Sequence, residues 1–240
     1  MMVYIEGFVA AVPAANKEVY RKHAAEAAPL FKEFGAIRMV ETWGDEVPDG
    51  KVTDFKGAVK AKPDEMVVFS WIEYADKATR DAANAKIMSD PRMSEKAAEM
   101  PFDGMRMIFG GFAPIVDDKV SGRMGYTDGF IVPVPTRNKE AYRELAAKMA
   151  QVFKDHGATR VVEAWGDDVP DGKVTDYKSA VKATSDEAVV YSWVEWPSKE
   201  ARSEGWKKMM EDPRMQMNME TMPFDGKRMI YGSFVPILDV

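Results

Sequence analysis

Several features that often reveal a function are absent from this chain of 240 residues, which has no cysteine and only two histidines. Without cysteine there can be no disulfides, thiolate metal sites or cysteine nucleophiles. No apolar run approaches the roughly 18 residues that a membrane helix needs. The N-terminus has no positively charged region and already carries Glu6, which argues against a secretory signal. We therefore expect a cytoplasmic protein, which the lack of disulfides also suits.

The chain also lacks an excess of positive charge. It has 33 Lys and Arg against 39 Asp and Glu, a formal net charge of −6, and no basic stripe. Non-specific nucleic-acid binding depends on clustered basic residues that displace counterions from phosphates. The sequence has no HExxH, P-loop, GxGxxG or Ser-His-Asp arrangement either. We expect no nucleic-acid or membrane partner and no dedicated cofactor.

The most informative feature present is an internal repeat. The segment WGDEVPDGKVTD at 43–54 recurs, with one conservative change, as WGDDVPDGKVTD at 165–176, 122 positions later. At the same offset, and without a gap, about half of all positions are identical, which indicates a duplicated domain rather than a short-period solenoid. We predict two domains, 1–118 and 125–240, joined by a polar linker at 119–124.

Each repeat has the residue pattern of a small α+β domain. β-branched and aromatic runs predict strands, and apolar residues at helical spacing predict helices. In the first repeat the expected strands are 4–12, 36–43, 66–74 and 105–115, and the expected helices are 16–34, 76–88 and a short one ending at 99. This order is the split βαβ arrangement of ferredoxin-like domains. The connection at 48–63 is longer than a hairpin needs, so it is a candidate pocket wall.

The predicted strands carry apolar residues on both faces. In the third strand Val67, Phe69 and Trp71 lie on one face and Val68 and Ile72 on the other. Helices cover one face of such a sheet, and a second sheet is the obvious cover for the other. We therefore predict an α+β fold in which two ferredoxin-like βαββαβ repeats form an intrachain pseudo-dimer, the whole chain being a monomer or a homodimer.

The most unusual segments resemble a known family. They are GDEVPDGKVT, AVKA followed by FSWIEY, DPRM and MPFDGMRMIFGGF, with matching copies in the second repeat. They resemble the small YbaA-like family of unknown function, number 1428, in the dimeric α/β-barrel superfamily. The resemblance covers nearly all of both repeats and implies two ferredoxin-like units that face each other as a barrel. That superfamily includes cofactor-free monooxygenases, cyclases, haem-processing enzymes and ligand-binding proteins, so the fold does not select a function.

Charged residues inside predicted strands are the strongest chemical signal. They recur in both repeats: Arg38, Glu41, Glu73 and Arg106, then Arg160, Glu163, Glu195 and Arg228. By alternation, Glu41 shares a face with Trp43, and Glu73 shares one with Trp71. An apolar neighbour raises the pKa of a carboxylate, which suits a general acid or base. Glu41, Glu73, Glu163 and Glu195 are thus candidate catalytic residues, although ion pairs that close the barrel ends would give the same pattern.

Aromatic and arginine side chains supply candidate ligand contacts. Indole rings offer flat apolar surfaces with one N–H donor, so four tryptophans could wall an aromatic pocket, and arginine could hold an anionic group. Core packing is the alternative for the tryptophans. The candidate ligand-binding residues are Trp43, Trp71, Arg106, Trp165, Trp193 and Arg228.

Neither the acidic loops nor the histidines predict a metal site. Asp45, Asp49 and Asp54 lie in one loop, but their spacing matches no EF-hand, so we assign them to turn formation. His23 and His156 have no counterpart in the other repeat. They cannot form a symmetric site, although a haem ligand in one half is an alternative.

These residues leave three functions open. The first is binding of a small apolar or aromatic molecule in a barrel or helix pocket. The second is cofactor-independent oxygenation, cyclisation or isomerisation by the strand carboxylates. The third is a structural or stress-associated role without turnover.

Overall fold

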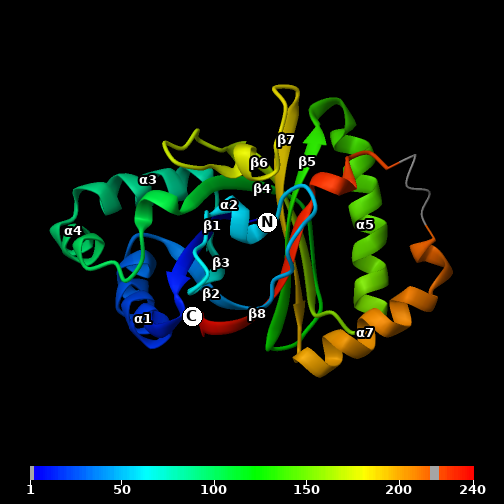
Figure 1. Cartoon of the computed structure of the whole chain (residues 1–240), viewed down its shortest axis with the longest axis horizontal. Coiled ribbons are helices and arrows are strands. Elements are labelled where there is room, and N and C mark those ends of the chain that lie inside the picture. The colour runs from blue at the N-terminus through cyan, green and yellow to red at the C-terminus, as the bar shows by residue number, and fades with distance from the viewer. Residues whose placement is uncertain (1–2, 217–221) are drawn as a thin grey trace.

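The computed structural model describes residues 3–216 and 222–240 (Figure 1). The first repeat consists of β1 (Tyr4–Pro13), η1 (Ala14–Asn16), α1 (Lys17–Glu33), β2 (Ala36–Glu46), α2 (Phe55–Ala58), β3 (Glu65–Tyr74), α3 (Lys77–Ser89), α4 (Pro91–Ala98), η2 (Gly104–Arg106) and β4 (Ile108–Lys119). The second consists of β5 (Tyr126–Pro135), η3 (Thr136–Asn138), α5 (Lys139–Asp155), β6 (Arg160–Asp168), α6 (Tyr177–Ala180), β7 (Glu187–Trp196), α7 (Lys199–Glu211), η4 (Pro213–Met215), η6 (Gly226–Arg228) and β8 (Ile230–Asp239).

The eight strands form one closed antiparallel barrel in the order β1-β3-β2-β8-β5-β7-β6-β4. Each repeat contributes four neighbouring strands. The two sheets join where β2 pairs with β8 and where β4 pairs with β6. Because every strand lies opposite its own copy in this order, the pseudo-two-fold axis runs along the barrel. The predicted α+β pseudo-dimer is confirmed, and closure leaves no exposed sheet edge.

The local signals in the sequence explain where most helices begin and end. Gly35 follows α1 with φ +112°, the left-handed backbone that glycine adopts easily. Asp76 caps α3 by accepting a hydrogen bond from the Thr79 amide, and Asp90 caps α4 ahead of Pro91.

Three details differ from the prediction. β4 begins at Ile108 and not at Met105, because Asp103 caps the 3-10 turn Gly104–Arg106. Arg106 therefore lies before the strand, and Arg228 occupies the same place in η6. The long connection contains the short helix α2, capped by Asp54, which is too short for its residue spacing to reveal.

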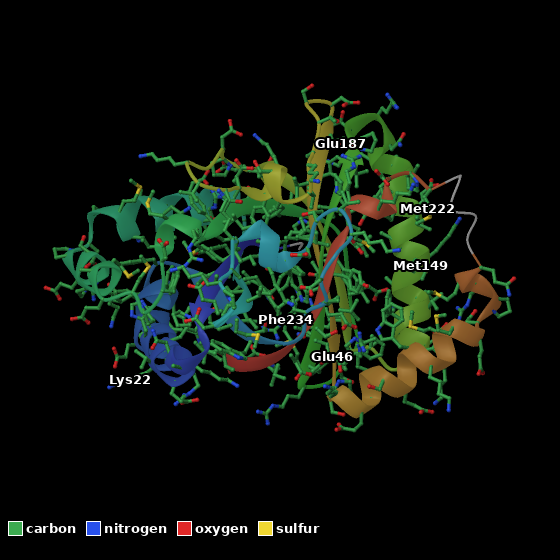
Figure 2. The ribbon with its side chains drawn as sticks, viewed as in Figure 1. Lys22, Glu46, Met149, Glu187, Met222 and Phe234 are labelled. Carbon is green, nitrogen blue, oxygen red and sulfur yellow. The ribbon has the colours of Figure 1, made fainter. Side chains whose placement is uncertain are left out.

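The barrel interior is filled with aromatic side chains. Phe69 stacks on Tyr191, and Trp71 stacks on Trp193, each with ring centroids 4.5 Å apart. Gly7 makes room for one ring, because a Cβ there would lie 3.0 Å from the Tyr191 ring. Figure 2 labels Phe234, which is fully buried in the middle of the barrel.

The helices lie outside the barrel. In the first repeat, α1, α3 and α4 cover one side, and in the second, α5 and α7 cover the opposite side (Figure 1). Under them lie apolar layers that include Met39 and Ile72 in the first repeat and Val161 and Val194 in the second. In the described part of the chain, no helix is both long and apolar enough to cross a membrane.

Candidate functional site

Two of the predicted catalytic carboxylates, Glu73 and Glu195, lie in an ionic cluster at one end of the barrel. Arg160 donates to Glu73 from Nη1 at 2.6 Å and from Nη2 at 3.1 Å. Arg38 donates from Nη1 to Glu195 at 2.7 Å and to Glu73 at 3.4 Å. Each arginine thus comes from one repeat and pairs with the glutamate of the other.

The rest of this cluster satisfies the remaining polar atoms. Arg38 also donates two 2.8 Å hydrogen bonds to Asp239, and Arg160 donates two of the same length to Asp117. The indoles supply further donors: Trp71 to Glu73 at 3.2 Å and Trp193 to Glu195 at 3.1 Å. Such pairing neutralises buried charge and joins the repeats, which corresponds to the structural interpretation of these glutamates.

The other predicted carboxylate of the first repeat, Glu41, lies on the outer face of β2, beneath α1. It is 8% exposed. Its Oε2 accepts a hydrogen bond from the Tyr20 hydroxyl at 2.7 Å and another from the Ser70 hydroxyl. Burial raises the pKa of Glu41, and the two hydroxyls offset that rise in part. No ion pair to Glu41 occurs in the described part of the chain.

The second repeat carries the same group. The Tyr142 hydroxyl donates to Glu163 Oε2 at 2.8 Å, and the Ser192 hydroxyl donates to the same oxygen. Burial again raises the pKa of Glu163. Burial and the nearby carboxylates also hold the pKa of both tyrosines well above 10, so both hydroxyls keep their protons.

Aromatic side chains surround each hydroxyl–carboxylate group. The ring of Phe102 packs edge-on against Tyr20 with centroids 5.6 Å apart. Trp43 belongs to the same buried cluster, and the Lys17 ammonium lies 5.4 Å from the centre of its ring. Asn16 fixes the covering loop by donating to the Pro101 carbonyl at 2.8 Å. The equivalent side chains in the second repeat are Phe224, Trp165, Lys139 and Asn138.

The remaining predicted tryptophans and arginines are occupied by protein contacts. Trp71 and Trp193 are completely buried in the barrel. Arg106 donates to both carboxylate oxygens of Glu65, at 2.7 and 2.6 Å, and this pairing lowers the pKa of Glu65 to about 2. Arg228 binds Glu187 in the same way, at 2.8 and 2.7 Å. Figure 2 labels Glu187, at the start of β7.

A third buried carboxylate differs between the repeats. In the second repeat Asp128 accepts from the indoles of Trp196 and Trp206 at 3.0 and 2.9 Å, and from Arg202. Its counterpart Glu6 pairs with Arg80. In the first repeat, Tyr74 and Asn84 occupy the positions of Trp196 and Trp206.

The histidine and loop-acid positions have ordinary partners. His156 Nε2 lies 2.8 Å from Asp212 Oδ2 at the end of α5. Burial lowers the pKa of His23. Asp45 accepts from the Tyr126 hydroxyl at 2.7 Å and from Lys199 at 2.6 Å. Residues 3–216 and 222–240 contain no cluster of acidic and histidine side chains suited to a metal ion.

Sequence reasoning missed the residues that complete the Glu41 group, namely Tyr20, Ser70 and Lys17. Tyr20 and Lys17 lie in a helix, and Ser70 lies in a strand, so no local motif connects them to Glu41. All three are identical at the 122-residue offset, as Tyr142, Ser192 and Lys139. That identity was the available signal.

Comparison with known proteins identifies the family. The model described as "Protein of unknown function (DUF1428)" matches residues 3–104 and again residues 125–226. The chain belongs to the DUF1428 family. A relative, "Uncharacterized protein YbaA" of Escherichia coli strain K12, is 66% identical over 117 residues. This alignment covers 49% of the present chain and 100% of the relative, whose length is thus that of one DUF1428 repeat.

Solved structures share the fold of this DUF1428 protein at very low sequence identity. A putative monooxygenase from Fusobacterium nucleatum has a TM-score of 0.60 at 8% identity, covering 99% of this chain and 94% of that one. A putative monooxygenase from Lactobacillus acidophilus has a TM-score of 0.59 at 10% identity, covering 100% and 96%. At these identities the likeness shows the dimeric α/β-barrel fold alone.

Proposed function

We propose that this protein is a proton-transferring enzyme that acts on a small, largely aromatic molecule, with Glu41 and Glu163 as general bases. The observation that carries the proposal is that each carboxylate, buried in Glu41 and half-buried in Glu163, has a raised pKa and accepts hydrogen bonds from two hydroxyls. In the described chain, no arginine or lysine forms an ion pair with either glutamate. Because side chains fill the barrel interior, we place the substrate outside the barrel, between α1 or α5 and the sheet.

The surroundings of Glu41 suit the removal of a proton from carbon. A carboxylate whose pKa is raised toward neutrality is a stronger base than an exposed one. Tyr20 and Ser70 fix its orientation, since both donate to the same oxygen. The Lys17 ammonium, beside the Trp43 ring, is placed to stabilise negative charge that develops on a substrate oxygen.

The substrate class follows from the walls of this site. Trp43 and Phe102 offer flat apolar surfaces that match an aromatic ring. Phe102 packs directly on Tyr20, so a bound ring takes the place of the Phe102 side chain. A substrate with a methylene group acidified by neighbouring aromatic rings and a carbonyl fits both the apolar walls and a carboxylate base.

Oxygenation is the version of this chemistry that the structural neighbours support, since two of them are named putative monooxygenases. Glu41 takes a proton from the methylene carbon, and the electron pair stays on the resulting enolate. Dioxygen then reacts with that carbon, so that CH2 and O2 become C=O and H2O. Cyclisation and isomerisation would begin with the same removal of a proton from carbon. A protein that only binds the molecule would not carry out this step.

The test uses anthrone, whose ring-flanked methylene has this chemistry, and measures oxygen uptake and solvent-deuterium exchange at that carbon. We expect the protein to accelerate both reactions and E41Q/E163Q to lose at least about 100-fold of the acceleration. E18Q/E140Q is the matched control, because it removes the same charge from exposed positions at the start of α1 and α5.

Three outcomes decide the proposal. Selective loss in E41Q/E163Q, with urea unfolding unchanged, supports it. Equal rates in E41Q/E163Q and the parent protein would overturn it. Binding of anthrone with neither exchange nor oxygen uptake would also overturn it, in favour of a binding protein without turnover.

A further inference from the structure

A groove lies on the pseudo-two-fold axis, at the barrel end opposite the arginine–glutamate cluster. There α2 and α6 are in contact, each leading into the start of β3 or β7, whereas Glu73 and Glu195 lie near the ends of these strands. A half-open cavity of about 430 Å³ lies between the two connections. Its lining includes Thr53, Lys60, Thr175, Ser179 and Lys182.

Hydrogen bonds between the repeats hold this groove together. The Thr53 hydroxyl donates to the Ala180 carbonyl, and the Thr175 hydroxyl donates to the Ala58 carbonyl at 2.6 Å. These threonines belong to the GKVTD segment, which is identical in the two repeats. The groove is therefore held in place by hydrogen bonds at the junction between the repeats.

The two lysines of the groove have an unusual backbone. In the described chain, Lys60 and Lys182 are the non-glycine residues with positive φ, at 49° and 52°. This left-handed conformation costs an L-residue free energy that glycine would not lose, and such residues gather at functional sites. Lysine occupies this position in both repeats, so its side chain is retained despite that cost.

Arg106 and Arg228 support this conformation. Arg106 Nη1 donates to the Lys60 carbonyl at 2.8 Å, and Arg228 Nη1 donates to the Lys182 carbonyl at 2.9 Å. Both guanidinium groups are themselves fixed by a buried glutamate. The two arginines are thus positioning residues for the lysines of the groove.

The charge of the groove favours an anion. Neither Lys60 nor Lys182 takes part in an ion pair within residues 3–216 and 222–240. The nearby Asp54 carboxylate accepts hydrogen bonds from the backbone amides of Gly57 at 2.6 Å and Gly50 at 3.0 Å. The lining thus carries two lysine ammonium groups and one carboxylate, so positive charge is in excess.

We propose that this groove binds a small dianion, with one acidic group facing Lys60 and the other facing Lys182. Short dicarboxylates and diphosphates share this chemistry and fit the cavity volume. The two-fold relation of the lysines favours a ligand with two similar ends. This inference does not depend on Glu41 or on the proposed reaction.

Isothermal titration calorimetry with succinate and with pyrophosphate, at low ionic strength, tests the site. We expect one of these ligands to bind with one molecule per chain, and K60A/K182A to weaken that binding at least tenfold. K56A/K178A is the matched control. It removes the same charge from α2 and α6, just before the groove lysines in the chain, at lysines that pair with Asp49 and Asp171 outside the groove.

A glycine variant separates the side chains from the backbone. K60G/K182G should raise the melting temperature, because glycine adopts positive φ without strain, and should lose binding as K60A/K182A does. Equal weakening in the control K56A/K178A, or binding retained in K60G/K182G, would overturn the proposal. So would the absence of binding by both succinate and pyrophosphate.

Discussion

Two pairs of strand glutamates occupy equivalent positions in the repeats but have different partners in the tertiary structure. Glu73 and Glu195 lie inside the barrel, where Arg160 and Arg38 neutralise them across the repeat boundary. Glu41 and Glu163 lie outside the barrel, beneath α1 and α5, with hydroxyl donors. Four residues of one type, all on strands, thus fall into two classes.

This contrast indicates that the hydrogen-bond or ion-pair partner of a strand carboxylate, and not its burial, separates structural acids from candidate catalytic ones. An arginine partner stabilises the charged form and fixes the position of both groups. Hydroxyl partners leave the proton affinity raised, which is the property a general base requires. Three predictions test this contrast, in order of decreasing effect.

The largest effect on stability is expected when an arginine partner of the paired glutamates is removed. R160M leaves Glu73 and Asp117 buried without this cation, which should lower the free energy of unfolding by about 3–5 kcal/mol. Urea unfolding measures the change. R143M, at an exposed arginine of α5, should cost less than about 1 kcal/mol. A similarly small loss of unfolding free energy in R160M would contradict a structural role for the cluster.

The glutamates with hydroxyl partners, Glu41 and Glu163, should make the stability of the protein depend on pH. Because the folded pKa of Glu41 and of Glu163 is raised, the folded state keeps a proton that the unfolded state has already lost. Stability must therefore fall as pH rises above the ordinary carboxyl range, by up to about 1.4 kcal/mol per pH unit and site. Urea unfolding between pH 4 and 9 should show this slope in the parent protein and a flatter one in E41Q/E163Q. Identical slopes would contradict the raised pKa.

The smallest effect is expected from removing one hydroxyl at each site. Y20F/Y142F should lower the free energy of unfolding by about 1 kcal/mol per site, since each carboxyl loses one donor. Loss of that donor also raises the pKa of both glutamates further. The pH–rate profile with anthrone should shift to higher pH. If stability falls but the pH–rate profile does not shift, the two tyrosines have only a structural role.

Much of the fold was predictable because its signals are local or periodic. The 122-residue repeat, the strand alternation and the caps at Asp76 and Asp90 each depend on residues close together in the chain. The errors arose where a short element interrupts a pattern. Helix α2 has four residues, and a 3-10 turn delays β4 to Ile108. Neither is long enough to show a period.

The candidate site was predictable only in part. Glu41 and Trp43 could be placed on one face of a strand by alternation. Tyr20 could not be connected to them, because it reaches Glu41 from a helix 21 residues earlier. The groove lysines were missed for another reason, since left-handed φ at a non-glycine residue leaves no signal in residue type.

The duplication, the ferredoxin-like order of elements and the need for a second sheet follow from the residues alone, because they depend on identity at a fixed offset and on apolar residues on both strand faces. Which glutamate pairs with an arginine does not follow from the residues alone. That choice depends on closure of the barrel, which brings Arg160 to Glu73 and Arg38 to Glu195 while leaving Glu41 and Glu163 under the helices. Side chains far apart in sequence thus obtain their hydrogen-bond and ion-pair partners only through packing.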